Sequence, residues 1–200
     1  MNQKTVEFFF DVGSPAAYLA WTQLPALCRQ AGAALVYRPM LLGGVFQATG
    51  NRSPVEVPAK GRYIRRDFER FAARCGVPLR FNPHFPINTL LLMRGATALQ
   101  MQDGGARFGD YCAAVFRAMW VDGRDLGAPE VVGQVLQAAG FEPAELLSLA
   151  GRQAVKDRLK AVTEEAVARG VFGAPTMFVG EQMFWGQDRL DFVREALAAS

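Results

Sequence analysis

The segment FFFDVGSPAAYLAW, residues 8–21, constrains the fold more than any other part of the chain. Consecutive phenylalanines after β-branched residues are typical of a buried strand, which we expect from Thr5 to Val12. Gly13 breaks that strand, Ser14 is a favoured helix N-cap, and Pro15 suits a first helical turn. The segment therefore predicts a strand that delivers a serine hydroxyl to the start of a helix.

The following residues complete a strand–helix–strand unit. The helical segment runs from Pro15 to Gly32, and ALVYRPMLL, residues 34–42, is typical of a second strand. Two strands joined by a helix of this length are expected to be parallel.

The middle of the chain changes character. Between residues 59 and 151, helical patterns alternate with glycine and proline punctuation, and we interpret this block as an all-helical insertion. After one more helix, residues 153–170, two short strands (APTMFVG and QMFWG) meet at a tight turn before a final amphipathic helix. The order is βαβ, helical insertion, α, ββα, which places the chain in the α/β class.

Charge and composition narrow the possible partners. The net charge is +3, and the only local excess of basic residues is the run from Lys60 to Arg74. We interpret this run as the solvated face of a helix, with a contact surface for an anionic small molecule as the alternative. Nucleic-acid binding would require a longer basic stripe with interleaved aromatic residues, so no nucleic-acid partner is expected.

The chain has few cysteine and histidine side chains, which argues against disulfide, zinc and Ser-His-Asp sites. Cys28, Cys75 and Cys112 form no C-x-x-C motif, which indicates a reducing compartment and no disulfide framework. The single histidine, His84, lies in a proline-rich segment, so neither a zinc site nor a Ser-His-Asp triad is expected. No apolar run is long enough to span a membrane, and we expect a cytoplasmic protein.

A second segment, near the end of the chain, supports the same kind of fold as the strand–helix corner around Ser14. VFGAPTMFVG, residues 171–180, places a proline directly before a late strand, and together with the element order this resembles the thioredoxin superfamily. A cis bond at Ala174-Pro175 would turn backbone groups toward the start of the first helix, where an extended peptide can pair with them. In redox members of the superfamily that helix begins with C-x-x-C. Here the stretch is SPAA, so disulfide exchange at this corner is excluded.

A serine at this position can instead stabilise a thiolate from another molecule. Its hydroxyl donates one hydrogen bond, and the helix N-terminus adds partial positive charge. A small thiol-bearing peptide fits both the hydroxyl and the peptide-binding edge, and glutathione is such a peptide. A plain N-cap is the alternative role for Ser14.

The motifs SPAAYLA, GNRSPVEVPAKGRY, FGAPTMF and FWGQDRL resemble the kappa-class glutathione transferases and the bacterial 2-hydroxychromene-2-carboxylate isomerases. The resemblance covers nearly the whole chain. It implies a thioredoxin-like domain of residues 1–58 and 152–200, a helical insertion domain of residues 59–151, and a homodimer. It also implies that Ser14 is catalytic and that glutathione is bound by Ser14, Ala174, Pro175, Trp185, Gly186, Gln187 and Asp188.

The sequence motifs point less specifically to the residues that bind the second substrate. Asn51 and Lys60 follow the second strand, and the FNPHFPIN segment offers Asn82, Phe85 and Asn88. All five are candidate substrate-binding residues. The chain departs from the family pattern at Ala16, commonly aromatic, and at Phe46, where a lysine can serve the substrate.

The activity implied by the resemblance is glutathione-dependent isomerisation of an aromatic pyruvate, by reversible thiolate addition to a C=C bond. The partners are then glutathione and a small aromatic carboxylate, with no metal. A kappa-class transferase or peroxidase is the alternative within enzymes. A peptide-binding thioredoxin-like module without catalysis is the alternative from another class.

Overall fold

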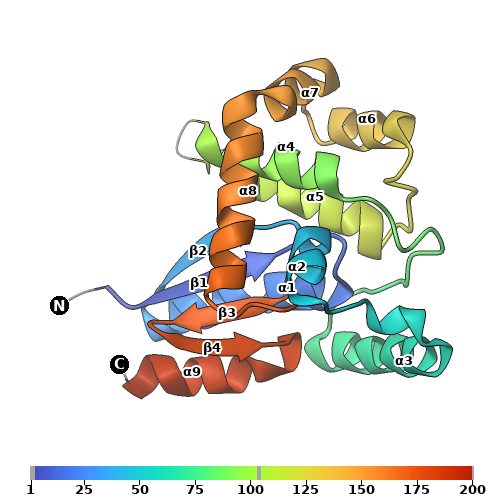
Figure 1. Cartoon of the computed structure of the whole chain (residues 1–200). Coiled ribbons are helices and arrows are strands. Elements are labelled where there is room, and N and C mark those ends of the chain that lie inside the picture. Colours follow the sequence, from blue (N-terminus) through green and yellow to red (C-terminus); the bar gives the residue numbers. More distant parts are fainter. Residues whose placement is uncertain (1–2, 103–104, 200) are drawn as a thin grey trace.

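The computed structural model describes residues 3–102 and 105–199, and its centre is a four-stranded sheet between layers of helices (Figure 1). The strands are β1 (Thr5–Phe10), β2 (Ala34–Pro39), β3 (Thr176–Val179) and β4 (Gln182–Trp185). Their order is β2-β1-β3-β4, with β1 and β2 parallel and the other pairs antiparallel. The parallel pair, the late hairpin and the α/β class are all confirmed.

The predicted helices are present, with some shifts of a few residues at their ends. They are α1 (Pro15–Ala31), α3 (Pro58–Cys75), α4 (Leu90–Met101), α5 (Phe108–Trp120), α6 (Pro129–Ala138), α7 (Pro143–Gly151), α8 (Gln153–Ala168) and α9 (Leu190–Ala199). A short 3₁₀ turn, Gln187–Arg189, precedes α9.

One helix, α2 (Leu42–Thr49), differs from expectation. The second strand ends at Pro39 rather than Leu42, and the chain turns into this helix. The Gly43-Gly44 pair has low helix propensity, which hides the helix in the sequence. Tertiary contacts stabilise it, because Val45 is fully buried and the Leu42 N–H donates to the buried Asp11.

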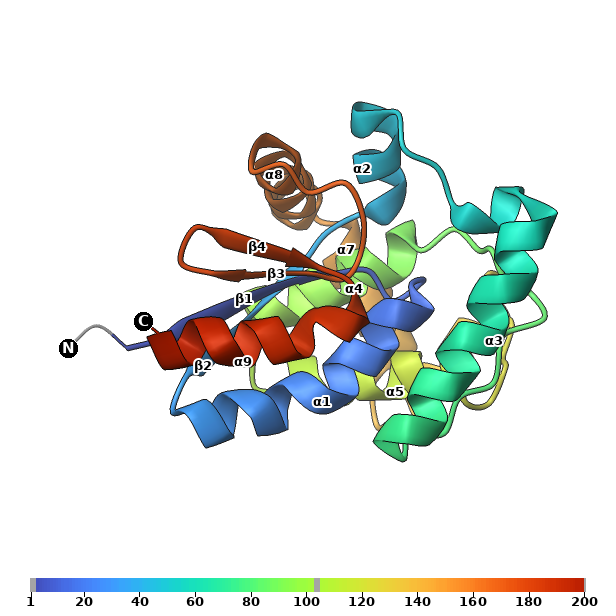
Figure 2. The same cartoon turned by 90° about the horizontal axis from the view of Figure 1, so that it is seen from below.

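Alternate residues of β1 supply the two faces of the sheet. Phe8 and Phe10 join the larger core with α1 and α9, whereas Phe9 joins a smaller core with α8 and α2. Figure 2 shows α1 and α9 on one side of the sheet and α8 and α2 on the other. This layering matches the expected thioredoxin-like arrangement.

The larger core continues into the insertion without a break. The Phe10 ring lies 5.9 Å from that of Phe116 and 6.3 Å from that of Phe108, both on α5. Buried residues of α4 to α7 belong to the same cluster. The division into domains at residues 59 and 151 stays a prediction, and the packing makes the insertion part of one core.

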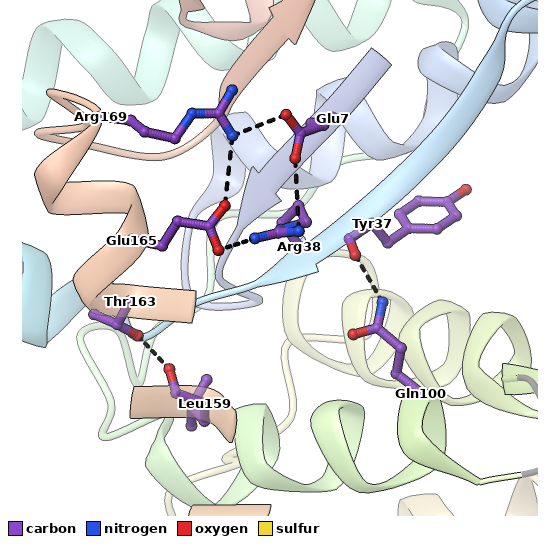
Figure 3. A network of polar contacts seen from close by, with 8 residues as sticks. All are labelled: Glu7, Tyr37, Arg38, Gln100, Leu159, Thr163, Glu165 and Arg169. Atoms are coloured by element: carbon purple, nitrogen blue, oxygen red, sulfur yellow. Dashed lines mark hydrogen bonds and ion pairs between the residues drawn. The ribbon is translucent and has the colours of Figure 1, made fainter. Parts of the chain in front are cut away.

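A network of charges holds α8 to the sheet (Figure 3). Arg38 of β2 pairs with Glu7 and Glu165, and Arg169 pairs with the same two carboxylates. The Arg169 guanidinium also lies 3.8 Å from the centre of the Phe178 ring. Because the loop to β3 begins directly after Arg169, the network fixes where that loop starts.

Candidate functional site

The corner between β1 and α1 places Ser14 at the helix start, as predicted. Ser14 has an extended backbone and is the N-cap of α1, and its Oγ accepts from the Ala17 N–H at 3.1 Å. The same Oγ donates to the Ala174 carbonyl oxygen at 3.0 Å. The side chain is almost fully buried, at 5% exposure. The N-cap role and the contact with the second segment are therefore compatible.

The loop before β3 supplies the opposing backbone. The Ala174–Pro175 bond is cis, and the Pro175 carbonyl accepts from the Gly186 N–H at 3.0 Å. The Ala174 N–H has no acceptor within the described part of the chain. Next to the serine hydroxyl there is consequently a strand-edge donor that a ligand backbone can use.

An aromatic pair flanks this loop. Trp185 pairs with Thr176 in the β3–β4 hairpin, is 48% exposed, and its ring lies 4.9 Å from that of Phe172. The indole crosses Gly173 so closely that a Cβ there would lie 2.6 Å from the Trp185 Nε1. Glycine at position 173 lets the indole lie against the cis-proline loop.

The chain after Trp185 forms a tight turn toward α9. Gly186 has a φ of 107°, a conformation that favours glycine, and a Cβ there would meet the Asp188 Oδ1 at 2.6 Å. Asp188 also pairs with its neighbour Arg189 at 2.6 Å. Gln187 is 6% exposed, and its side-chain amide has no hydrogen bond to any residue in the described ranges.

The predicted substrate residues fall into separate places. Asn51 donates from Nδ2 to the Phe172 carbonyl at 2.7 Å, so it joins the segment after α2 to the cis-proline loop. Lys60 lies exposed in the first turn of α3. Asn88 is exposed, and its Oδ1 accepts from the Leu90 N–H at the start of α4.

Asn82 and Phe85 have structural surroundings. The Asn82 amide donates to the carbonyls of Met119 and Arg124, at 2.9 and 2.8 Å, and its Oδ1 accepts from the His84 N–H. With 1% exposure, this side chain has its hydrogen bonds taken by the backbone at the end of α5, by the segment that follows α5, and by His84 of its own loop. The Phe85 ring packs 5.6 Å from that of Trp120, half-buried against the core.

One important side chain escaped the sequence analysis. Asp11 is 1% exposed and accepts hydrogen bonds at 2.9 Å from the Gly13 N–H, the Leu42 N–H and the Thr89 hydroxyl. Burial raises the pKa of its carboxyl above the ordinary 3.8, and the three hydrogen bonds oppose that rise. The signal in the sequence was an acid at the end of an otherwise apolar strand.

Two of the chain's three thiols are poorly suited to chemistry because they are buried. Cys28 and Cys112 are buried, and burial raises the pKa of the Cys28 thiol to about 11 and that of Cys112 well above its usual range. Within residues 3–102 and 105–199, no three His, Cys, Asp or Glu side chains gather to hold a metal ion. No helix in those ranges is both long and apolar enough to cross a bilayer.

Comparisons with known proteins agree with this geometry. A family model described as a DSBA-like thioredoxin domain matches residues 5–198. A 2-hydroxychromene-2-carboxylate isomerase of Sphingobium xenophagum is 34% identical, over 97% of this chain and 98% of that relative. The human glutathione S-transferase kappa 1 is 27% identical, over 97% of this chain and 91% of its own length.

A solved structure of a 2-hydroxychromene-2-carboxylate isomerase superposes with a TM-score of 0.85 and 30% identity, covering 98% of this chain and 95% of that one. The resemblance inferred from the sequence motifs is thereby confirmed. The chain belongs to the DsbA-like thioredoxin family, and shares it with the 2-hydroxychromene-2-carboxylate isomerases.

Proposed function

We propose that this chain is a glutathione-dependent isomerase of an aromatic pyruvate, of the 2-hydroxychromene-2-carboxylate type. The observation that carries the proposal is the Ser14 hydroxyl, at the start of α1 and 3.0 Å from the carbonyl before the cis-proline. The corner carries no cysteine, so a sulfur that reacts there belongs to a ligand. The relative that is 34% identical carries the isomerase name.

Glutathione fits the donor set at this corner. The free Ala174 N–H offers one backbone bond to its cysteinyl unit, in the manner of an added strand. Gln187, with its unpartnered amide, and Asp188 at the following turn would hold the γ-glutamyl end, where an ammonium needs a carboxylate. Pro175, Trp185 and Gly186 would line the same half-site.

Bound glutathione supplies a thiolate that adds reversibly to the conjugated C=C bond, which can rotate as a single bond before elimination restores it. Ser14 would keep that sulfur ionised. Its hydroxyl has one proton, which can turn from the Ala174 carbonyl to a sulfur while Oγ still accepts from Ala17. The N-terminus of α1 adds favourable potential for the anion.

We assign the residues that bind the aromatic substrate from their positions in the fold. Asn51, bonded to the cis-proline loop, and Lys60 in the first turn of α3 would face the acidic end of an aromatic pyruvate. Phe85 and Asn88 would border its ring. Asn82 is not carried into this proposal, because its amide is buried and bonded to the carbonyls of Met119 and Arg124.

A kappa-class transferase or peroxidase would use the same glutathione half-site, and the 27% identity to the human kappa enzyme favours it as the alternative. The rival from another class is a peptide-binding module without catalysis. A cytoplasmic location and a homodimer stay predictions from the sequence.

Calorimetric titration with reduced glutathione and with S-methylglutathione tests the proposal, in protein first cleared of co-purified glutathione. We expect glutathione to bind, and binding to weaken on S-methylation or in Ser14→Ala. Aromatic pyruvates are then screened for isomerisation by absorbance, with an electrophile and a peroxide as the transferase and peroxidase assays. Absence of glutathione binding would reject both enzyme classes and leave the peptide-binding module.

A further inference from the structure

Three helices begin at the carboxylate of one buried residue. Asp11 accepts from the N–H of Gly13, which precedes the N-cap of α1, and from the N–H of Leu42, the first residue of α2. It also accepts from the hydroxyl of Thr89, the N-cap of α4. All three distances are 2.9 Å. Helix starts carry unpaired N–H groups and partial positive charge, so a carboxylate at their meeting point satisfies both.

The corner that carries Ser14 also touches α4 and α5 directly. The Val12 N–H points to the Met93 sulfur at 3.4 Å, and the Val12 carbonyl accepts from the Trp120 indole at 2.8 Å. A Cβ on Gly13 would lie 2.7 Å from the Thr89 Cγ2. The two residues before the serine are therefore held between the sheet and the insertion.

These contacts leave Ser14 little freedom of its own. Its N–H donates to the Asp11 carbonyl at 3.0 Å, so the backbone and the side chain of Asp11 both set the corner. Two of the three donors to the carboxylate are backbone N–H groups, whose directions follow the chain itself. The Thr89 hydroxyl is the one contact that a side-chain substitution can remove without changing Asp11.

We propose that Asp11 is the positioning residue of the site: by joining the starts of α1, α2 and α4 it holds the Ser14 hydroxyl where the glutathione sulfur binds. This inference rests on the proposed function. The inference also gives α4 a part in the chemistry, because Thr89 at its start donates to Asp11. The helical insertion then helps to set the ionisation of the glutathione sulfur, which binds to the thioredoxin-like half. Asp11 itself acts only through Ser14.

The test compares Thr89→Val with Thr97→Val. Both remove a buried threonine hydroxyl from α4 without changing side-chain shape, but Thr97 donates only to the Met93 carbonyl of its own helix, at 2.8 Å. The readout is the ultraviolet absorbance of the thiolate of bound glutathione, followed against pH in the full-length protein. S-methylglutathione affinity is measured beside it, since that ligand has no ionisable sulfur.

We expect Thr89→Val to move the absorbance midpoint upward by about half a pH unit, because Ser14 donates less well to the sulfur. S-methylglutathione affinity stays as in the wild type. Thr97→Val leaves both unchanged, although each variant unfolds at a lower temperature. A merely structural role for Asp11 would lower the unfolding temperature without moving the midpoint.

Two results overturn the inference alone: an unmoved midpoint in Thr89→Val, or equal shifts in the two variants. In both cases the wild type still binds glutathione with a lowered thiol pKa, and the proposed function survives. A wild-type protein that binds no glutathione, or leaves its thiol pKa unlowered, rejects the proposed function and this inference with it.

Discussion

Ser14 and Ala174 lie 160 residues apart in the sequence, and the serine Oγ donates to the alanine carbonyl oxygen at 3.0 Å. This bond joins the first strand–helix corner to the loop that precedes β3. It also holds the single hydroxyl proton in a bond that a ligand sulfur can replace. The two segments that the sequence motifs singled out are thus in direct contact.

Ser14→Ala should reduce catalysis far more than stability. Loss of the one hydroxyl donor is expected to lower turnover by about 100-fold, as for other sites that stabilise an anion. Loss of the N-cap bond should cost about 1 kcal/mol in the free energy of unfolding. Isomerase assays and denaturant titrations measure the two effects. Ser53→Ala is the matched control, because Ser53 is the N-cap of the short 3₁₀ turn Pro54–Glu56 and makes no side-chain capping bond. Equal activity in the two variants would remove Ser14 from the mechanism.

Gly173→Ala should displace the Trp185 indole, because the new Cβ would lie 2.6 Å from its Nε1. The half-exposed ring can move into solvent, so we expect the fold to persist and glutathione to bind more weakly. Trp185 fluorescence, obtained by subtracting the spectrum of Trp185→Phe, reports the movement. Gly43→Ala, at a position with nothing within 4 Å, is the control. An unchanged spectrum and affinity would contradict the assignment of this loop to the ligand site.

Asn82→Ala should act on stability and leave glutathione affinity unchanged. The substitution leaves the buried Met119 carbonyl without its Asn82 donor and removes one of the two bonds to the Arg124 carbonyl, so we expect a loss of about 2 kcal/mol in the free energy of unfolding. Chemical denaturation and calorimetry measure the two quantities. Normal stability with a raised KM for the aromatic substrate would return Asn82 to the substrate pocket.

The pH dependence of stability should carry the signature of Asp11. Its pKa in the folded state is raised above 3.8 by burial, so the folded protein binds this proton more tightly than the unfolded chain does. Its contribution to stability is therefore complete below about pH 4 and declines as pH rises through the folded-state pKa. The free energy of unfolding of the wild type minus that of Asp11→Asn should fall over this range. A difference that grows with pH would mean that the three hydrogen bonds outweigh burial.

Much of the fold followed from local patterns. The aromatic run before Gly13 and the GAPTMFVG segment formed strands as expected, and helix starts coincided with Ser14 and several prolines. These signals are local, since strand and helix preferences and capping depend on neighbouring residues. The helix α2 was missed because its glycines disfavour a helix, and it forms through tertiary contacts such as the bond to Asp11, the bond from the Leu41 N–H to the Thr163 hydroxyl and the burial of Val45.

Some features of the candidate site likewise followed from the sequence, and others only from the tertiary structure. By itself, the sequence determined that a serine stands at a helix start without a redox thiol, and that a late proline precedes a strand. The tertiary structure decided that these two meet, that the Asn82 amide bonds to the backbone at the end of α5, and that Asp11 gathers three helix starts. Contacts between distant residues depend on how the elements pack around the shared core, and no local pattern around Asp11, Leu42 or Thr89 specifies that meeting point.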